Sequence, residues 1–276
     1  MLLATLARSR VRFHFPAVHF ARIDAPPNTR QNQKRTTMTV PSPATDQSNF
    51  GVRRERPTIT TVIFDVDDTL YDVGTGFTAY RNTDGATSFM VDRLNFSSKE
   101  EAQKLRDEYF ARYHSTAKGL TVAEEEGRLP PLPEGTSLPE GKTKLFDPAD
   151  LDEYWATNLD YSYLGGPDPK CVEMFEYLSK GEGPCSELDL VVFSNGPRKY
   201  VSRALEEMDL MRFFPANKLF SVTDVLPHCK PDKGSFDQVL QSVGAKAEEC
   251  VMVEDSMKNV RAAKALGMKT ILVVGG

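Results

Sequence analysis

The stretch Thr61-Val-Ile-Phe-Asp65-Val-Asp67-Asp68-Thr69-Leu70-Tyr71 decides the fold, because a short apolar run ends there abruptly in carboxylates. A β-branched run of this length is typical of a buried strand, so its acidic end must lie at the edge of a sheet. Three carboxylates so close together repel one another and need a cation, and Mg²⁺ prefers such oxygen ligands. The simplest chemistry that uses this pattern is a Mg²⁺-assisted attack by a carboxylate on a phosphate.

The composition bounds the class of protein. The chain has 276 residues, of which 40% are hydrophobic and 26% are charged, as in one globular unit with room for a subdomain. A net charge of −5 argues against nucleic acid as a partner. No apolar run approaches the roughly 20 residues of a membrane span, so no membrane partner is expected. The cysteines show no metal-type spacing and are expected to be free thiols. They are Cys171, Cys185, Cys229 and Cys250.

Residues 1–57 are expected to form a tail outside the fold. Residues 1–37 contain seven Lys/Arg and a single acid, Asp24, and residues 38–57 are rich in Pro, Ser, Thr and Asp without periodicity. Two interpretations stay open. The basic start resembles an organellar transit peptide, which would place the protein in a mitochondrion or plastid. The alternative is a basic tail on a cytoplasmic protein.

Strand-like and helix-like runs alternate from residue 60 onward. The expected strands are Thr61–Asp65, Leu188–Ser194, Lys218–Val222, Cys250–Glu254 and Thr270–Val274. The expected helices between them are Arg198–Met208, a helix with Phe236, Val239, Leu240 and Val243 that ends at Gly244, and Met257–Leu266. Apolar strands that alternate with helices predict an α/β fold with a doubly wound, mostly parallel, Rossmann-like sheet.

Residues 76–164 interrupt this alternation with helical patterns, the clearest of which is Lys99–Tyr113. We therefore expect a catalytic core of residues 58–75 and 165–276 with an inserted helical cap of residues 76–164. Within the cap, residues 121–150 contain five prolines and three glycines and are expected to form a surface loop.

Polar clusters follow several of the expected strands. Asp65 and Asp67 follow the first, Ser194-Asn195-Gly196 the second and Glu254-Asp255 a later one, and Lys230 stands before a helix. In an open parallel sheet these carboxyl ends surround one crevice where ligands bind. Each cluster alone is as well explained by a cap or a turn. Their occurrence in this order is the stronger signal.

This order of motifs resembles the haloacid dehalogenase superfamily of phosphohydrolases, over residues 61–276. The first motif of that superfamily, D-x-D-x-[TV], matches residues 65–69, and the other three match Ser194, Lys230 and the pair Glu254-Asp255. Three further stretches resemble the pyrimidine 5′-nucleotidase-like branch of that superfamily. They are Leu70-Tyr71, Tyr113-His-Ser-Thr116-Ala-Lys118-Gly-Leu and Glu254-Asp255-Ser-Met-Lys-Asn259. Members generally continue beyond the equivalent of Gly276. We therefore expect either a truncated gene model or a last strand that closes the core.

The resemblance implies a mechanism. Asp65 is the expected nucleophile that forms an aspartyl-phosphate, and Asp67 is the expected acid and base. Mg²⁺ is expected on one oxygen of Asp65, the main-chain carbonyl of Asp67 and the carboxylate of Asp255, with assistance from Glu254. Phosphate is expected to bind the Ser194 hydroxyl, the main-chain amides of Asn195 and Gly196, and Lys230. Lys230 also balances the charge of Asp65.

The expected activity is hydrolysis of a small phosphomonoester, with a pyrimidine nucleoside 5′-monophosphate as the leading substrate. A sugar phosphate, phosphoglycolate or a vitamin phosphate is the alternative. Haloacid dehalogenation is disfavoured because it does not need an acid at position 67, and a non-catalytic relative is disfavoured because all the motif residues are present. The sequence does not indicate an oligomeric state. Candidate substrate contacts are Tyr71, Tyr113, Thr116, Lys118 and Asn259, although the aromatic residues also suit a core.

Overall fold

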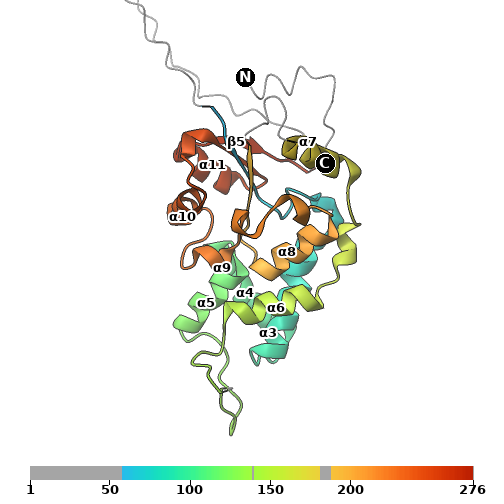
Figure 1. The fold of residues 1–276 in the computed structure, drawn as a ribbon. Coiled ribbons are helices and arrows are strands. Elements are labelled where there is room, and N and C mark those ends of the chain that lie inside the picture. The colour runs from blue at the N-terminus through green and yellow to red at the C-terminus, as the bar shows by residue number, and fades with distance from the viewer. Residues whose placement is uncertain (1–57, 139, 181–187, 276) are drawn as a thin grey trace, which may run out of the picture.

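The computed structural model describes residues 58–138, 140–180 and 188–275, so the expected tail and Cys185 lie outside the described residues. Its centre is a sheet of five parallel strands in the order β3-β2-β1-β4-β5, which confirms the predicted α/β, Rossmann-like fold class (Figure 1). The strands are β1 (Thr61–Phe64), β2 (Asp189–Phe193), β3 (Leu219–Phe220), β4 (Cys250–Glu254) and β5 (Lys269–Leu272).

Helices cover the sheet and form a second body beside it. In the first part of the chain they are α2 (Phe77–Tyr80), α3 (Ala86–Arg93), α4 (Lys99–Tyr113), α5 (Thr116–Glu125) and α6 (Pro148–Asn158). After residue 164 they are α7 (Pro169–Ser179), α8 (Arg198–Glu207), α9 (Val222–Val225), α10 (Lys233–Val243) and α11 (Met257–Ala265). A single π-helical turn, Arg81–Gly85, joins α2 to α3.

The central strand β1 is apolar throughout because both of its faces are covered. Val62 and Phe64 belong to a core cluster on one face, and the Phe64 ring lies 4.9 Å from that of Phe175 in α7. Ile63 belongs to a separate cluster on the other face, with Phe236 of α10 among its members. Successive side chains of a strand point to opposite faces, so the two clusters follow from the period of two.

Four of the five strands differ from the prediction at their ends, and β1 stops one residue early while β2 is one residue shorter at each end. The expected strand 218–222 is reduced to the two residues of β3, because Ser221 begins α9 with a capping box that includes Asp224. The expected strand 270–274 lies one residue earlier and ends at Leu272. By contrast, β4 and α4 have the predicted bounds.

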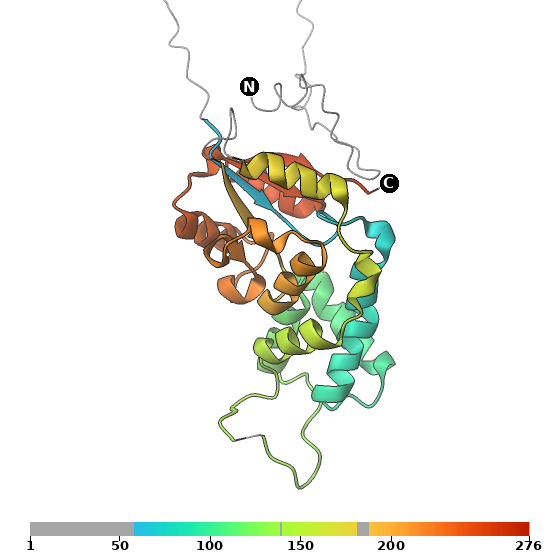
Figure 2. The same ribbon diagram turned by 45° about the vertical axis from the view of Figure 1, so that its right-hand side comes forward.

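The described helices between residues 77 and 164 gather below the sheet in Figures 1 and 2. We call this segment, residues 76–164, the cap. The loop predicted at 121–150 is shorter than expected and spans 126–147, and it projects from the far end of the cap (Figure 2). Residues 121–125 continue α5, where Val122 and Ala123 are buried. Asp147 and Pro148 begin α6 as its N-cap and first helical residue.

The cap packs on the core through α6 and α8. The carboxylate of Asp152 in α6 accepts a hydrogen bond from the main-chain amide of Tyr200 in α8, 3.1 Å away. The indole of Trp155 stands edge-on to the Tyr200 ring, with 5.6 Å between centroids. Both contacts are buried, so α8 links the cap to the sheet.

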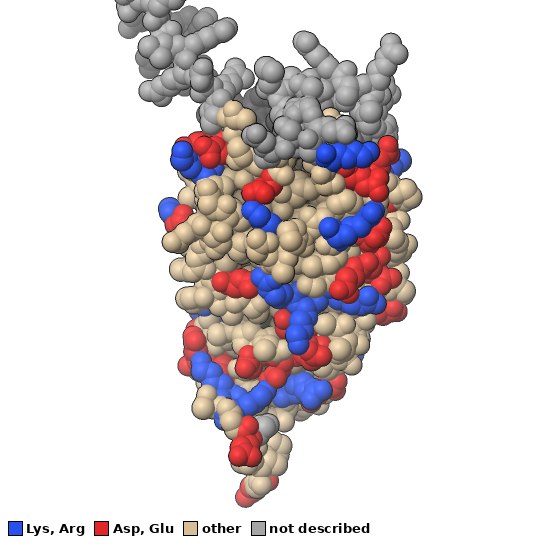
Figure 3. Space-filling model, in the orientation of Figure 1, with Lys and Arg blue, Asp and Glu red and all other residues tan. Residues whose placement is uncertain are grey.

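The surface and the thiols agree with the expected class. On the face in Figure 3, acidic and basic side chains are interspersed, and neither sign dominates. None of the helices in the described ranges has the length and apolar character that crossing a membrane requires. Cys171, Cys229 and Cys250 are buried free thiols.

Candidate active site

The carboxyl ends of three neighbouring strands bring the predicted motif residues together. Asp65 follows β1, Ser194 follows β2, and Glu254 is the last residue of β4. The main-chain amide of Asp65 donates to the carbonyl of Val253, so the ladder between β1 and β4 continues into the motif. Because β1 is central, its end lies between the other two.

Lys230 is the buried cation of this cluster, with only 1% of the residue exposed. Its Nζ lies 2.6 Å from Oδ1 of Asp65 and 2.8 Å from Oε2 of Glu254, and it donates a third bond to the carbonyl of Phe193. These three acceptors use all three protons of the ammonium group. Burial alone would lower the pKa of Lys230, but the two carboxylates outweigh burial and raise it. The two carboxylates therefore favour the charged form of Lys230.

Thr69 links the two acidic segments of the site. Its hydroxyl donates to Oδ2 of Asp65 at 3.1 Å and accepts a bond from the main-chain amide of Asp255 at 3.1 Å. The carboxylates of Asp65, Glu254 and Asp255 each place an oxygen within 4.8 Å of the others, and Asp255 is the most accessible of the three. This donor set consists of hard oxygens only, which Mg²⁺ prefers.

The raised pKa values of two of these carboxyl groups show that nearby cations compensate their negative charge only in part. Burial, and next the charge of Glu254, raise the pKa of Asp65 to about 7 despite its contact with Lys230. Burial, and next the charges of Asp65 and Glu254, raise the pKa of Asp255 to about 9. A cation between the three carboxylates would remove this repulsion, so the residues present fit a divalent metal ion.

Asp67 has a different partner, which the sequence did not predict. Nη1 of Arg81, at the start of the π-helical turn, lies 2.7 Å from Oδ1 of Asp67, and both side chains are largely buried. The hydroxyls of Tyr71 and Tyr200 donate to the same carboxylate oxygen. Burial alone would raise the pKa of Asp67, but the Arg81 guanidinium outweighs it and lowers that pKa. Asp67 is thus held ionised by a residue of the cap.

Arg81 and Tyr200 could not be found from motif spacing. Arg81 follows a short aromatic stretch, and its guanidinium lies 5.3 Å from the Trp155 ring centroid and 4.8 Å from that of Tyr200. Arg81 and these two rings come from three separate segments that meet only in the folded chain. The sequence offers no clear signal for Arg81, because the polar residues that follow it, Asn82 to Asp84, do not mark a buried position, and the π-helical turn is visible only in the structure.

Hydrogen bonds hold the residues that follow β2, Ser194 to Gly196, in place. Ser194 Oγ accepts the amide of Gly196 at 2.9 Å and lies 3.4 Å from Oδ2 of Asp67. The side chain of Asn195 exchanges two hydrogen bonds with the main chain of Lys230, at 2.8 and 2.9 Å. The structure therefore places Asn195 as a support for Lys230. The main-chain amide of Gly196 donates to the Ser194 hydroxyl, whereas the sequence analysis expected this amide to bind phosphate.

The predicted substrate residues lie in three places. Tyr113, Thr116 and Lys118 surround the turn between α4 and α5, and Ser115 in that turn donates to the carbonyl of Asn195 at 3.1 Å. The hydroxyl of Thr116 is buried and has no partner in the described parts of the chain. Tyr71 is buried against Asp67 and Thr78, so its ring is not free to stack on a base. Asn259 is buried on α11.

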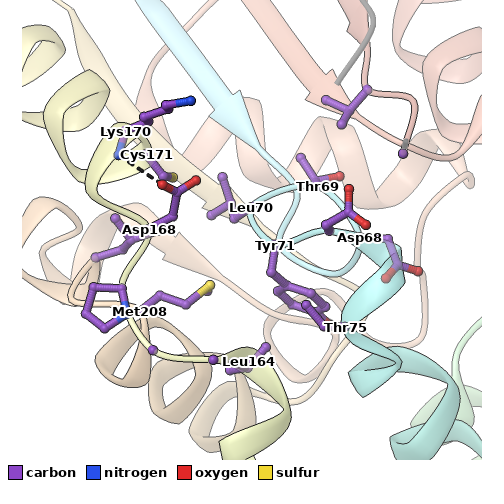
Figure 4. A pocket seen from close by; sticks show the side chains of 17 residues that line it. Asp68, Thr69, Leu70, Tyr71, Thr75, Leu164, Asp168, Lys170, Cys171 and Met208 are labelled. Atoms are coloured by element: carbon purple, nitrogen blue, oxygen red, sulfur yellow. Dashed lines mark hydrogen bonds between the residues drawn. The ribbon is translucent and has the colours of Figure 1, made fainter. Parts of the chain in front are cut away.

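A pocket of about 290 Å³ lies behind the first motif and does not include its reacting groups. Figure 4 shows it between the turn that carries Asp68 and Tyr71 and the segment that carries Leu164 and Asp168. Asp65, Lys230 and Asp255 are not among its lining residues. The candidate active site is therefore the carboxylate cluster at the strand ends.

Comparisons with known proteins agree with this arrangement. The haloacid dehalogenase-like hydrolase family matches residues 59–267. Phosphoglycolate phosphatase from Pseudomonas syringae pv. syringae is 33% identical over 89 residues, which are 32% of this chain and 32% of that protein. The match thus spans about a third of the length of that relative.

Solved structures show a similar fold. CbbY from Rhodobacter sphaeroides, in complex with phosphate, has a TM-score of 0.50 at 18% identity and covers 77% of this chain and 85% of its own. L-2-haloacid dehalogenase from Xanthobacter autotrophicus has a TM-score of 0.43 at 20% identity, over 77% of this chain and 76% of its own. At 18% identity the likeness to CbbY concerns the fold alone, and no argument rests on the dehalogenase match at a TM-score of 0.43.

Proposed function

The chain belongs to the haloacid dehalogenase-like hydrolases, and from this premise we propose that it is a Mg²⁺-dependent phosphomonoester hydrolase. The observation that carries the proposal is the buried Asp65 carboxylate, held by Lys230 beside Glu254 and Asp255 at the carboxyl end of the central strand. A phosphomonoester resists attack because its negative charge repels nucleophiles. A nucleophile flanked by cations overcomes this repulsion.

Asp65 is the proposed nucleophile. One of its oxygens bonds to Lys230 and the other to Thr69, so the orientation of the carboxylate is fixed by two partners. Attack on phosphorus would form an aspartyl-phosphate on Asp65 and release the alcohol. Lys230 would then balance the charge that the phosphate brings next to Asp65 and Glu254.

Asp65 and Asp255 would hold the metal ion, with Glu254 beside them and the main-chain carbonyl of Asp67 as a further ligand. When bound, Mg²⁺ shields the attacking carboxylate from the phosphate and stabilises the charge of the transferring group. Glu254 is engaged on both oxygens, by Lys230 and by the main-chain amide of Ser256. Its proposed part is therefore to orient Lys230 and to support the metal.

Asp67 would first take up a proton, deliver it to the leaving oxygen, and afterwards, as the carboxylate, remove one from the hydrolytic water. The ionised state in the structure, held by Arg81 and Tyr200, suits the last of these steps. Ser194 lies beside Asp67 and would donate its hydroxyl to a phosphate oxygen. An acid at position 67 has no use in hydrolytic dehalogenation, so phosphate hydrolysis is the better account of this residue.

The phosphoglycolate phosphatases among the relatives support a small phosphomonoester as the substrate. A pyrimidine nucleoside 5′-monophosphate stays a prediction, carried by Tyr113, Thr116 and Lys118 at the α4–α5 turn. Burial of Tyr71 removes one of the aromatic side chains that would have stacked on a base.

The test is phosphate release from a panel of phosphomonoesters by the purified protein, with Mg²⁺ and with EDTA. Asp65→Asn should lower kcat by roughly 10⁴-fold or more, as loss of a nucleophile does, while circular dichroism stays unchanged. Asp237→Asn is the matched control, since Asp237 is an exposed carboxylate paired only with Lys233. Turnover by Asp65→Asn close to that of the control would refute the nucleophile, and metal-independent turnover would refute the role of Mg²⁺.

A further inference from the structure

The cavity of about 290 Å³ behind the first motif lies where the cap joins the core. The chain passes between these two bodies in residues 72–75 and again in residues 165–168, which we call the first and the second linker. Both linkers line the cavity, the first with Asp72 and Thr75 and the second with all four of its residues. A molecule in the cavity would therefore contact both covalent connections of the cap.

Much of the cavity wall is apolar. The side chains of Leu70, Leu164 and Met208 line it from three different segments of the chain (Figure 4). Small-molecule sites are mostly apolar and begin at roughly 300 Å³, so this cavity has the size and the lining of a site for a small ligand. The hydrocarbon part of such a ligand would replace water against these side chains.

The charged lining of the cavity is mainly acidic. Asp68, Asp72 and Asp168 line it, whereas Lys170 is the basic side chain among the described residues that do so. Oδ1 of Asp68 and Oδ2 of Asp72 have no hydrogen-bond partner in the described parts of the chain. Carboxylates in such surroundings favour a ligand that brings N–H donors and a positive charge. The lining therefore matches a small molecule with one cationic end and one apolar end.

Two residues of the cavity wall are bonded directly to reacting groups of the candidate active site. Thr69 lines the cavity, and its hydroxyl donates to Oδ2 of Asp65 at 3.1 Å. Tyr71 also lines it, and its hydroxyl donates to Oδ1 of Asp67 at 2.7 Å. A molecule in the cavity would thus leave the reacting carboxylates accessible to substrate while it contacts the residues that position them.

We propose that this cavity binds a small organic ammonium ion and that its binding slows turnover. The ammonium group lies beside Asp68 and Asp72, and the hydrocarbon part lies against the apolar wall. The binding site goes beyond the proposed phosphatase function and does not depend on it. The effect on turnover rests on that function.

The effect on turnover follows from the place of the cavity between the linkers. A ligand stabilises the arrangement that it fits, so an occupant favours the position of the cap in this structure. In this position Asp65 and Lys230 are buried, with 4% and 1% of each residue exposed. Exchange of substrate and product then requires the cap to move, which bends both linkers. An occupied cavity opposes that movement.

Binding is tested with two probes of nearly the same shape, cyclohexylmethylamine and cyclohexylmethanol, by NMR of the methionine methyl groups. The amine should shift the signal of Met208, which Met208→Leu identifies, and should bind on the order of 10-fold more tightly than the alcohol. The signal of Met252 should not move, because Met252 belongs to the core cluster on the other face of the sheet. Equal affinities, or an unchanged Met208 signal, would overturn the proposal.

Variants assign the preference for the amine to the two carboxylates. Asp72→Asn and Asp68→Asn should each weaken binding of the amine several-fold and leave that of the alcohol unchanged. Asparagine can still accept the Gly74 amide at position 72, and it tolerates the positive φ of 57° at position 68. Asp160→Asn is the control, because Asp160 caps a neighbouring turn by accepting the Ser162 amide without lining the cavity. An undiminished preference for the amine in both variants would show that the carboxylates do not bind it.

Turnover is measured with a phosphomonoester that the wild-type protein hydrolyses. The amine should lower kcat without raising KM, at concentrations that shift the Met208 signal, and Asp72→Asn should resist it. An increase in KM alone would mean competition at the active site and would overturn the proposal. Unchanged kcat with an occupied cavity would refute the effect on turnover. If no ester is hydrolysed, the phosphatase proposal fails, and the NMR measurement alone decides the binding site.

Discussion

Replacing Lys230 with methionine tests the electrostatic account of the site. The ammonium group has 1% exposure and compensates two buried carboxylates, those of Asp65 and Glu254. Methionine keeps most of the volume but leaves both carboxylates without their cation. Breaking one side of a buried ion pair destabilises a protein by about 3–5 kcal/mol. For a domain of this size that corresponds to a decrease in Tm of about 6–20 °C.

The dependence on pH distinguishes this explanation from a simple packing defect. Without Lys230 the folded-state pKa of the buried Asp65 carboxyl group lies still further above its unfolded value. The destabilising effect of this carboxyl group is therefore absent below about pH 4, develops as the pH rises from there towards the folded-state pKa, and is complete above it. The wild-type protein in turn loses the benefit of the ion pairs at low pH. The difference between the two proteins should be large at pH 8 and small at pH 5.

Urea unfolding in EDTA at both pH values measures this difference. Lys233→Met is the matched control, because Lys233 is three residues away and exposed, and it should change the free energy of unfolding by less than about 0.5 kcal/mol. Mg²⁺ should restore part of the loss in Lys230→Met, since it supplies charge to the same carboxylates. If Lys230→Met is as stable as the control in EDTA at pH 8, or equally destabilised at both pH values, the electrostatic reasoning is wrong.

Two further predictions concern the other charges of the site. Because the pKa of Asp65 is raised to about 7 and that of Asp255 to about 9, the metal-free protein should lose stability as the pH rises from about 4 towards these two values. The increase in Tm on adding a fixed Mg²⁺ concentration should accordingly grow from pH 6 to pH 9, and a constant increase would contradict the assignment. Arg81→Gln should raise the pKa of Asp67, so the basic limb of the kcat/KM profile, where the acid for the leaving group loses its proton, should move to higher pH by about one unit or more. Arg93→Gln, on the exposed side of α3, should leave the limb in place.

The parts that were predictable from the sequence depend on local patterns or on topology. The strand Cys250–Glu254 and the helix Lys99–Tyr113 have their predicted bounds, because apolar periodicity and caps act within a few residues. The gathering of Asp65 and Glu254 followed from parallel topology alone, since parallel strands place their carboxyl ends at one edge. No contact distance was needed for that inference.

The parts that were missed depend on contacts between distant segments. Arg81 meets Asp67 because a π-helical turn directs it toward the core, between rings from α6 and α8. The excess of proline in 121–150 hid the start of α6, where Asp147-Pro148 is itself a helix signal. The proline content of the whole segment 121–150 therefore predicted a loop where the two residues Asp147 and Pro148 indicate the start of a helix.

The charges that the fold brings together explain why a divalent cation suits this site better than a further basic side chain. Lys230 neutralises part of the Asp65–Glu254 pair from within the core, and Arg81 neutralises Asp67 from the cap. The site has four carboxylates, those of Asp65, Asp67, Glu254 and Asp255. Among the described residues, Lys230 and Arg81 are the two basic side chains paired with them. At least two negative charges therefore remain, concentrated on Asp65 and Asp255, whose pKa values are raised. One divalent ion offsets both charges, and it leaves when chelated, whereas a second lysine would be permanent and would compete with the substrate phosphate for Asp65. The cap takes a direct part in this balance of charge, because Arg81 of the cap is the cation that outweighs burial and lowers the pKa of Asp67.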